Sequence, residues 1–248
     1  MALSQTKMSF REGPIIRLLE AHADLRQGLD AQQAAAATAR VVVRTVHLPE
    51  GRWAPSDFGS ERAEQLALLI IEGLLSRTVT LGGRTVVELL GDEDLLQPWD
   101  DHFEPTSVPA EVRWTVLRPT QLAVLDERFA ASVGLWPAIS ASLLNRAVAR
   151  SGWLARHFAI LDQPRLDVRL VLLFWELADR WGTVAPDGIS VPVPLTHQTL
   201  GRIVRAQRPS VTAALKDLRE RRFLSRGTDG TWVIHGDALE QLRELTSE

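Results

Sequence analysis

The feature that most constrains this chain is a pair of short amphipathic segments joined by a tight turn, within residues 194–218. Thr196 is a suitable N-cap for the first segment, and Leu195 and Leu200 have the spacing of a hydrophobic staple. Apolar residues recur at three- and four-residue intervals in the second segment. Pro209 falls in its first turn, where a missing N–H costs nothing. This pattern predicts a helix-turn-helix.

Charge distinguishes this helix pair from an ordinary helical hairpin, which is the alternative interpretation. Residues 196–227 contain eight Lys or Arg and two acidic residues, a local net charge of +6, whereas the whole chain carries −3. A basic helix pair in an acidic chain favours a surface that faces phosphates. Two short β-type runs follow, on either side of the hairpin turn signal Asp229-Gly230. The stretch as a whole therefore predicts a winged helix that binds DNA.

Length and composition limit the remaining possibilities. The chain has 248 residues, enough for two domains, and its 45% apolar and 24% charged content is typical of globular proteins. It contains no cysteine, which excludes disulfides, thiolate metal sites and a catalytic cysteine. Apolar runs such as residues 170–175 are too short to span a bilayer, and no signal peptide is visible. We therefore expect a cytoplasmic, soluble protein without a membrane partner.

The first half of the chain predicts a small helical segment followed by an antiparallel sheet. Residues 1–39 are expected to hold short helices, one over residues 14–21 and another over residues 24–39. From Arg40 onward, short β-branched and apolar segments alternate with turn residues, and Gly82-Gly83 is a hairpin turn. Many short strands at near-regular spacing predict an antiparallel β-roll or jelly roll over residues 40–135.

A long helix is predicted over residues 136–162. Its apolar and small residues step by three and four along a possible a/d seam, which is short for a coiled coil, so a helix packed on its own domain is the alternative. Small residues at the middle of the seam favour a partner helix and hence a homodimer. The break at Asp162-Gln163-Pro164 then leads into a winged helix-turn-helix over residues 163–248, giving an α+β chain. The predicted dimer interface consists of Leu144, Ala147, Ser151, Leu154, Phe158 and Leu161.

The order of these parts resembles the Crp/Fnr family of bacterial transcription regulators. The resemblance is most specific at Ile160-Leu161-Asp162, at Leu200-Gly201-Arg202-Ile203-Val204 and at Arg208-Pro209-Ser210-Val211-Thr212. It implies a roll like a cyclic-nucleotide-binding domain and a homodimer that reads near-palindromic double-stranded DNA. It also implies RNA polymerase as a partner if the protein activates transcription.

The resemblance assigns roles to individual residues of the helix-turn-helix. Arg208 occupies the position of the family's base-reading arginine, whose fork suits O6 and N7 of guanine. Pro209 replaces a residue that is often polar, so the half-site should differ from that of glutamate-bearing members. Arg205 stands where many members have a turn glycine. The full set of predicted DNA-binding residues is Thr196, Gln198, Arg205, Gln207, Arg208, Pro209, Ser210, Thr212, Lys216 and Arg226.

The roll departs more from the family. Gln97-Pro98 and Ala110-Glu111 replace the glycine-glutamate and arginine-serine pairs that hold a cyclic nucleotide, and Glu111 would repel a phosphate. The expected effector, if there is one, is therefore a small molecule other than cyclic AMP or GMP. Trp99 and Trp114 either line an apolar ligand pocket or, as we slightly favour, fill the core. Ser151 matches a hydroxyl that touches the nucleotide in some members.

Nothing in the sequence argues for an enzyme, a metal site or a cofactor. The histidines are scattered without HxH or HxxxH spacing, at positions 22, 47, 102, 157, 197 and 235. The competing hypothesis is a cupin-like small-molecule-binding or enzymatic roll with an accessory C-terminal domain. It is weak because a metal-dependent cupin needs clustered histidines, and the roll holds only His47 and His102. A DNA-binding protein that needs no ligand is a further alternative.

Overall fold

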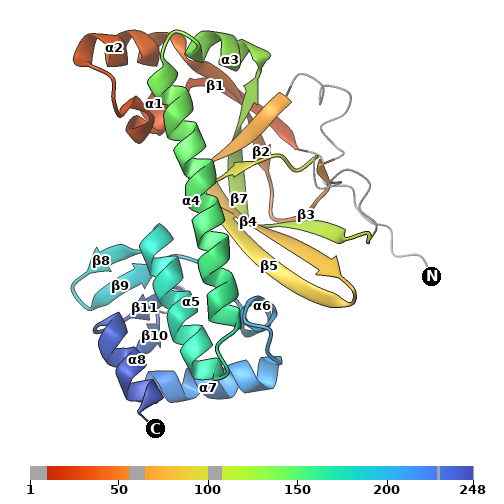
Figure 1. Cartoon of the computed structure of the whole chain (residues 1–248), viewed down its shortest axis with the longest axis vertical. Helices are drawn as coiled ribbons and strands as arrows, with labels where there is room; N and C mark the ends of the chain where they lie inside the picture. The colour runs from red at the N-terminus through yellow and green to blue at the C-terminus, as the bar shows by residue number, and fades with distance from the viewer. Residues whose placement is uncertain (1–9, 56–64, 100–107, 228–229, 248) are drawn as a thin grey trace. The chain divides into compact units, whose positions relative to one another are not determined.

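The computed structural model describes residues 10–55, 65–99, 108–227 and 230–247, and Figure 1 shows its elements. It consists of two compact units, residues 1–151 and 152–248, whose division falls within the long helix α4 (Pro137–Leu161). The predicted α+β class is confirmed, with an antiparallel sheet in the first unit and a helix-turn-helix in the second. Within the described part of the chain, no helix is long and apolar enough to cross a membrane.

The first unit is built on one antiparallel sheet whose main strand order is β1-β2-β7-β4-β5, with β3 on β7 and β6 on β4. Short helices precede and follow the strands, and α4 begins after them. In chain order the elements are β1 (Arg11–Arg17), α1 (Leu18–Ala21), the 3₁₀ helix η1 (Ala23–Arg26), α2 (Ala31–Arg40), β2 (Val42–Leu48), β3 (Gly51–Trp53), β4 (Gln65–Leu81), β5 (Arg84–Gly91), β6 (Leu95–Leu96), β7 (Glu111–Asp126) and α3 (Glu127–Val133).

Two long strands, β4 and β7, form the centre of this sheet. The sequence predicts two shorter strands where β4 lies and two where β7 lies. Instead, β4 and β7 each continue through irregularities at which the register shifts. One shift lies at Gly73, where an added Cβ would come within 2.3 Å of the Thr120 hydroxyl. Such bulges bend a strand without ending it, which is why turn-like residues here do not divide the strands. The long β4–β5 hairpin, visible in Figure 1, turns at Gly82-Gly83 as predicted.

The start of the chain differs from the prediction. The sequence predicts a helix over residues 14–21, but β1 occupies Arg11–Arg17 and the helix begins only at Leu18. Pro14 lies at the register shift between Glu12 and Ile15, in a strand at the end of the strand order. This is where a sheet tolerates proline, because the missing N–H removes no bond from a central ladder. The pairing of β1 with β2 overrides the helical signal.

Apolar side chains of the first unit form two cores. One lies among α1, α2, α3, the start of α4 and the neighbouring sheet, and includes Leu18, Leu69 and Phe129. The other lies within the roll and includes Leu75, Leu122 and both members of the pair formed by Trp53 and Trp114. The alternation of buried residues along β4 and β7 supplies both cores from the same strands.

The second unit is a winged helix-turn-helix, as predicted. Its four-stranded antiparallel sheet has the order β10-β11-β9-β8, and Phe174 of α5 packs on Trp232 of β11 with ring centroids 4.9 Å apart. The C-terminal turns of α4 belong to this unit. After them come α5 (Leu166–Trp181), β8 (Thr183–Ala185), β9 (Gly188–Val191), α6 (His197–Ile203), α7 (Arg208–Glu220), β10 (Leu224–Arg226), β11 (Trp232–Ile234) and α8 (Ala238–Thr246).

Candidate DNA-binding surface

Helix α6 is held at both ends by side-chain contacts, of which the sequence predicts those at the N-terminal end. The Thr196 hydroxyl accepts a hydrogen bond from the Thr199 N–H at 3.1 Å, so Thr196 is the predicted N-cap. Leu195 and Leu200 are fully buried, as a hydrophobic staple requires. At the other end, the Arg169 guanidinium donates to the carbonyl of Val204 at 2.6 Å. These contacts fix the helix that supports α7.

The turn between α6 and α7 needs a close approach and a left-handed residue. The Ala206 N–H donates to the Gly201 carbonyl at 2.8 Å, and a Cβ on Gly201 would lie 2.6 Å from the Ala206 oxygen. Arg205 has φ = 54°, a conformation that glycine adopts without cost. Arg205 therefore occupies the conformation expected of a turn glycine while it also presents a cation to solvent. The turn keeps its geometry although the glycine is absent.

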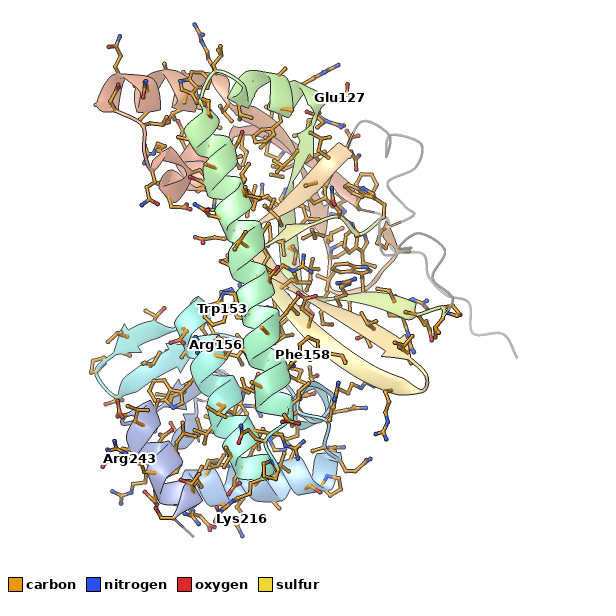
Figure 2. The ribbon with its side chains drawn as sticks, viewed as in Figure 1. Glu127, Trp153, Arg156, Phe158, Lys216 and Arg243 are labelled. Atoms are coloured by element: carbon orange, nitrogen blue, oxygen red, sulfur yellow. The ribbon has the colours of Figure 1, made fainter. Side chains whose placement is uncertain are left out.

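Helix α7 presents its polar face outward. Val211, Leu215 and Leu218 are buried against the domain, while Arg208, Pro209, Ser210, Thr212 and Lys216 are exposed. Pro209 lies in the first turn of the helix, and the N-cap Gln207 makes no capping bond with its exposed side chain. Figure 2 shows Lys216 on the outer side of α7. The first turn of α7 thus offers an arginine and small polar groups to a partner.

Positive charge from α7 and β10 converges near the N-terminus of α6. Burial lowers the pKa of His197 below its ordinary value, and the cations Arg226, Arg208 and Arg219 lower it further. The Thr212 hydroxyl donates to the Arg208 carbonyl at 3.0 Å, and the His197 Nδ1 lies 2.9 Å from the same hydroxyl oxygen. His197 is therefore a neutral hydrogen-bonding link between α6 and α7 within a field that attracts anions.

The other predicted DNA-binding residues differ in how freely they can reach a partner. Arg226 on β10 donates to the Gly230 carbonyl at 3.3 Å, and its guanidinium carbon lies 5.2 Å from the centroid of Trp232. Lys216 forms an exposed ion pair with Glu220 at 3.7 Å. Gln198, Gln207 and Ser210 are exposed. Sequence reasoning gave no site role to His197, Arg202, Arg219 and Arg222, although the local excess of basic residues already included the three arginines.

The predicted ligand residues of the roll lie mostly in its core. Trp114 is 4% exposed and packs edge-on against Trp53 with ring centroids 5.5 Å apart. Trp99 is half-buried against the same core. Glu111 is exposed and pairs with Arg113 at 2.9 Å. The exposed Ser151 hydroxyl donates to the Ala147 carbonyl of its own helix at 3.4 Å. Phe103 and His102 lie outside the described residues.

Helix α4 leaves apolar side chains in solvent. Leu144, Val148 and Phe158 are 64%, 62% and 57% exposed, and Ala147 and Ser151 are exposed too. Leu154 and Leu161, also predicted as interface residues, are half-buried. Figure 2 shows that Phe158 and Trp153 leave α4 on different sides. Val148, at 3.5-residue spacing between Leu144 and Ser151, was not among the predicted interface residues.

Comparison with known protein families identifies the class of the second unit. Residues 168–244 match the family described as a Crp-like helix-turn-helix domain. The matched segment includes α5, the helix-turn-helix, the wing and most of α8. Most of the second unit is therefore similar to a Crp-like helix-turn-helix domain. Comparison with curated proteins by sequence finds no match.

Solved structures share the fold over most of the chain. A cyclic nucleotide-binding domain containing protein from Listeria monocytogenes is 18% identical with a TM-score of 0.64, covering 88% of this chain and 97% of its own. A CooA mutant from Carboxydothermus hydrogenoformans is 14% identical with a TM-score of 0.61, covering 99% and 98%. A transcriptional regulator of the CRP/FNR family from Thermus thermophilus is 18% identical with a TM-score of 0.51, covering 82% and 98%.

These findings confirm the resemblance to Crp/Fnr regulators, by sequence for the C-terminal domain and by fold for the rest of the chain. They do not favour the cupin-like alternative.

Proposed function

We propose that this protein is a homodimeric transcription regulator that binds near-palindromic double-stranded DNA through α7. The observation that carries the proposal is the exposed Arg208 in the first turn of α7, which acts on His197 of α6 together with the cations Arg219 of α7 and Arg226 of the wing. In a helix-turn-helix the first turns of the second helix reach base edges in the major groove. Arg208 would read guanine there, while Gln198, Gln207 and Ser210 contact phosphates.

A dimer of two chains would bind both halves of a near-palindromic DNA site. The exposed apolar side chains of α4 support a helix–helix interface, because a stripe of large apolar residues in water is costly unless a partner covers it. Two α7 helices related by a two-fold axis would enter successive major grooves about 34 Å apart. The protein would act in the cytoplasm, and it would contact RNA polymerase if it activates transcription. No catalytic residue is needed for this role.

The proposal is tested by selection of DNA from a random duplex pool with the purified full-length protein and no added ligand. We expect an enriched near-palindrome whose half-sites lie about one helical turn apart. Its affinity should fall sharply when the half-sites are moved apart by about five base pairs, since this places them on opposite faces of the duplex. Enrichment of a single unpaired half-site would contradict the dimer, and binding without sequence preference would contradict base reading by α7.

The dimer is tested separately by sedimentation of the free protein. Replacing Phe158 with Ser removes the largest exposed apolar side chain of the stripe and should shift the population toward monomers. The matched control is Leu239→Ser on α8, because Leu239 is similarly exposed at 63% but lies outside α4. A wild-type protein that sediments as a monomer at all concentrations would refute the interface.

A further inference from the structure

A second cluster of polar side chains lies in the first unit. His22, Asp24 and Glu93 each offer one ligand atom, and these atoms lie within 4.8 Å of one another. His22 ends the short helix α1, Asp24 lies in η1, and Glu93 lies in the turn that follows β5. No local pattern in the sequence indicates this cluster, since Glu93 is far along the chain from the other two residues.

The histidine of this cluster is buried, and one of its ring nitrogens is unpaired. His22 is 5% exposed, and its Nε2 atom makes no hydrogen bond with any described residue. An unpaired buried nitrogen costs free energy, so its presence calls for an explanation. Burial and the charge of Arg146 lower the pKa of His22 to about 4. An imidazole nitrogen without a protein partner is available as a ligand for a metal ion.

The two carboxylates are exposed, and the turn that carries Glu93 is held in place. The Glu93 N–H donates to the Ile70 carbonyl at 3.0 Å, and the Asp94 carbonyl accepts from the Ile70 N–H at 3.0 Å. The Asp94 carboxylate also accepts from the Gly91 N–H at 2.8 Å. These bonds fix the turn to β4. A cation arriving from solvent would meet two accessible carboxylates in front of a buried imidazole.

Arg146 on α4 shares one of these carboxylates. Its Nη2 donates to Asp24 Oδ2 at 2.5 Å, while its buried Nε and Nη1 atoms have no hydrogen-bond partner among the described residues. The bond uses one oxygen of Asp24 and leaves the other available. The cluster carries two negative charges and one positive charge, so it retains a net attraction for a divalent cation. Arg146 limits that attraction and links the cluster to α4.

We propose that His22, Asp24 and Glu93 form a binding site for a divalent first-row transition metal ion. One imidazole nitrogen and two carboxylate oxygens would hold the ion, and water would complete its coordination. An imidazole ligand suits Zn²⁺ and its neighbours, whereas Mg²⁺ and Ca²⁺ prefer oxygen ligands alone. Because Asp24 would serve both the ion and Arg146, occupancy of this site would change how firmly Asp24 holds α4.

The test uses the full-length protein, stripped of metal with a chelator and then titrated with Zn²⁺ against a chromophoric competitor. We expect one Zn²⁺ per chain, and absorption bands of a bound ion when Co²⁺ is used instead. Glu93→Gln and His22→Gln should each weaken Zn²⁺ binding by at least about tenfold, because each removes a ligand atom. The matched controls Glu127→Gln and His47→Gln change an exposed glutamate of α3 and an exposed histidine of β2, and should bind as the wild type does.

Three results would overturn the proposal. These are the absence of stoichiometric Zn²⁺ binding, unchanged binding by the Glu93 variant, and displacement of Zn²⁺ by an equal concentration of Mg²⁺. Glu93 is exposed, so its variant still tests the site if the buried His22 substitution impairs folding.

Arg146 provides a test with the opposite sign. Arg146→Gln removes the neighbouring cation and frees the second oxygen of Asp24, so Zn²⁺ affinity should rise by roughly threefold to tenfold. A residue that only supports the structure would lower the affinity when replaced, or leave it unchanged. Either of those results would show that Arg146 does not share a ligand with the ion.

Discussion

Two sets of arginines, one in each unit, are used in opposite ways. In the first unit, Arg150 is joined to Glu88 by two hydrogen bonds of 2.8 and 3.0 Å, and Arg77 approaches the same carboxylate at 3.5 Å. In the second unit, Arg205 and Arg208 are exposed and form no ion pair with any described residue. An arginine paired inside a domain fixes the position of the elements that it joins. An exposed, unpaired arginine remains available for an anion that the protein does not itself supply.

The difference teaches how each unit is constrained. The second unit matches a known family by sequence, and under the proposed function its exposed surface would meet the same phosphate backbone in every target. The first unit keeps its fold at low identity while its polar side chains pair with one another. Arg150 also donates to the Leu95 carbonyl at 2.8 Å, so its pairing ties α4 to two parts of the sheet. Substitutions in the two units should therefore affect different properties.

The largest effect is expected at Glu88. Its side chain is 11% exposed and faces two guanidinium groups, so Glu88→Gln would remove a negative charge that two partly buried cations share. The free energy of unfolding should fall by about 2–3 kcal/mol, measured by urea denaturation. Glu127→Gln, at an exposed position of α3, is the control and should change it by less than about 0.5 kcal/mol. Equal stability of the two variants would show that pairing does not hold the first unit.

Arg208→Ala should weaken DNA binding and leave the folding stability almost unchanged. Loss of a bidentate contact to guanine should weaken binding to the selected DNA site by about 1–3 kcal/mol and relax preference at one base pair. Folding stability should stay within about 0.5 kcal/mol, because the side chain is exposed and forms no ion pair with a described residue. Binding is measured by fluorescence anisotropy, with Arg243→Ala on α8 as a control that removes an exposed arginine from the same domain (Figure 2). Equal losses of affinity in both variants would mean that only net charge matters.

Arg205→Gly should change the folding stability and the DNA affinity in opposite directions. Glycine accepts the φ of 54° more readily, so the free energy of unfolding should rise by about 0.5 kcal/mol. The lost cation should lower affinity for all DNA sequences and reduce the slope of log affinity against log salt by about one. Arg205→Ala removes the same charge but keeps the backbone cost, so it should bind DNA as the glycine variant does without the gain in stability. A gain in both variants would refute the backbone explanation.

The smallest effect is expected at His197, where folding depends on pH. Its pKa is below the ordinary 6.5 because of burial and neighbouring arginines, so the unfolded chain takes up a proton more readily than the folded one. This contribution to stability is present above about pH 6.5 and is lost as the pH falls below it. Urea midpoints measured from neutral pH to about pH 5 should decline less in His197→Gln than in the wild type. A steeper decline in the variant would mean that the sign is wrong.

Local signals made the second unit predictable from sequence. The cap at Thr196, the staple at Leu195 and Leu200, and the proline in the first turn of α7 all act within a few residues of one another. Each specifies the structure of its own segment, and together they indicate the same fold. Arg205 is the exception, because an arginine does not by itself indicate the left-handed backbone conformation that it adopts here.

The first unit was harder to predict because its deciding contacts are distant in sequence. Pro14 suggested the start of a helix, yet pairing with β2 places it in a strand. Gly73 suggested a break, yet its contact with Thr120 makes it a bulge inside β4. His22 and Glu93 lie 4.8 Å or less apart at their ligand atoms only because both approach the backbone near Ile70. No local sequence pattern predicts contacts between residues that lie so far apart in the chain.

The aromatic composition has an optical consequence. The chain has eight tryptophans and no tyrosine, so its fluorescence on near-ultraviolet excitation comes almost entirely from indole groups. In the first unit, Trp53 and Trp114 lie 5.5 Å apart at 69°, close enough for their excited states to couple and give a paired circular dichroism signal. In the second unit, Trp232 lies beneath the wing arginine Arg226. Both units thus carry intrinsic chromophores, and unfolding of the chain can be followed without an added label.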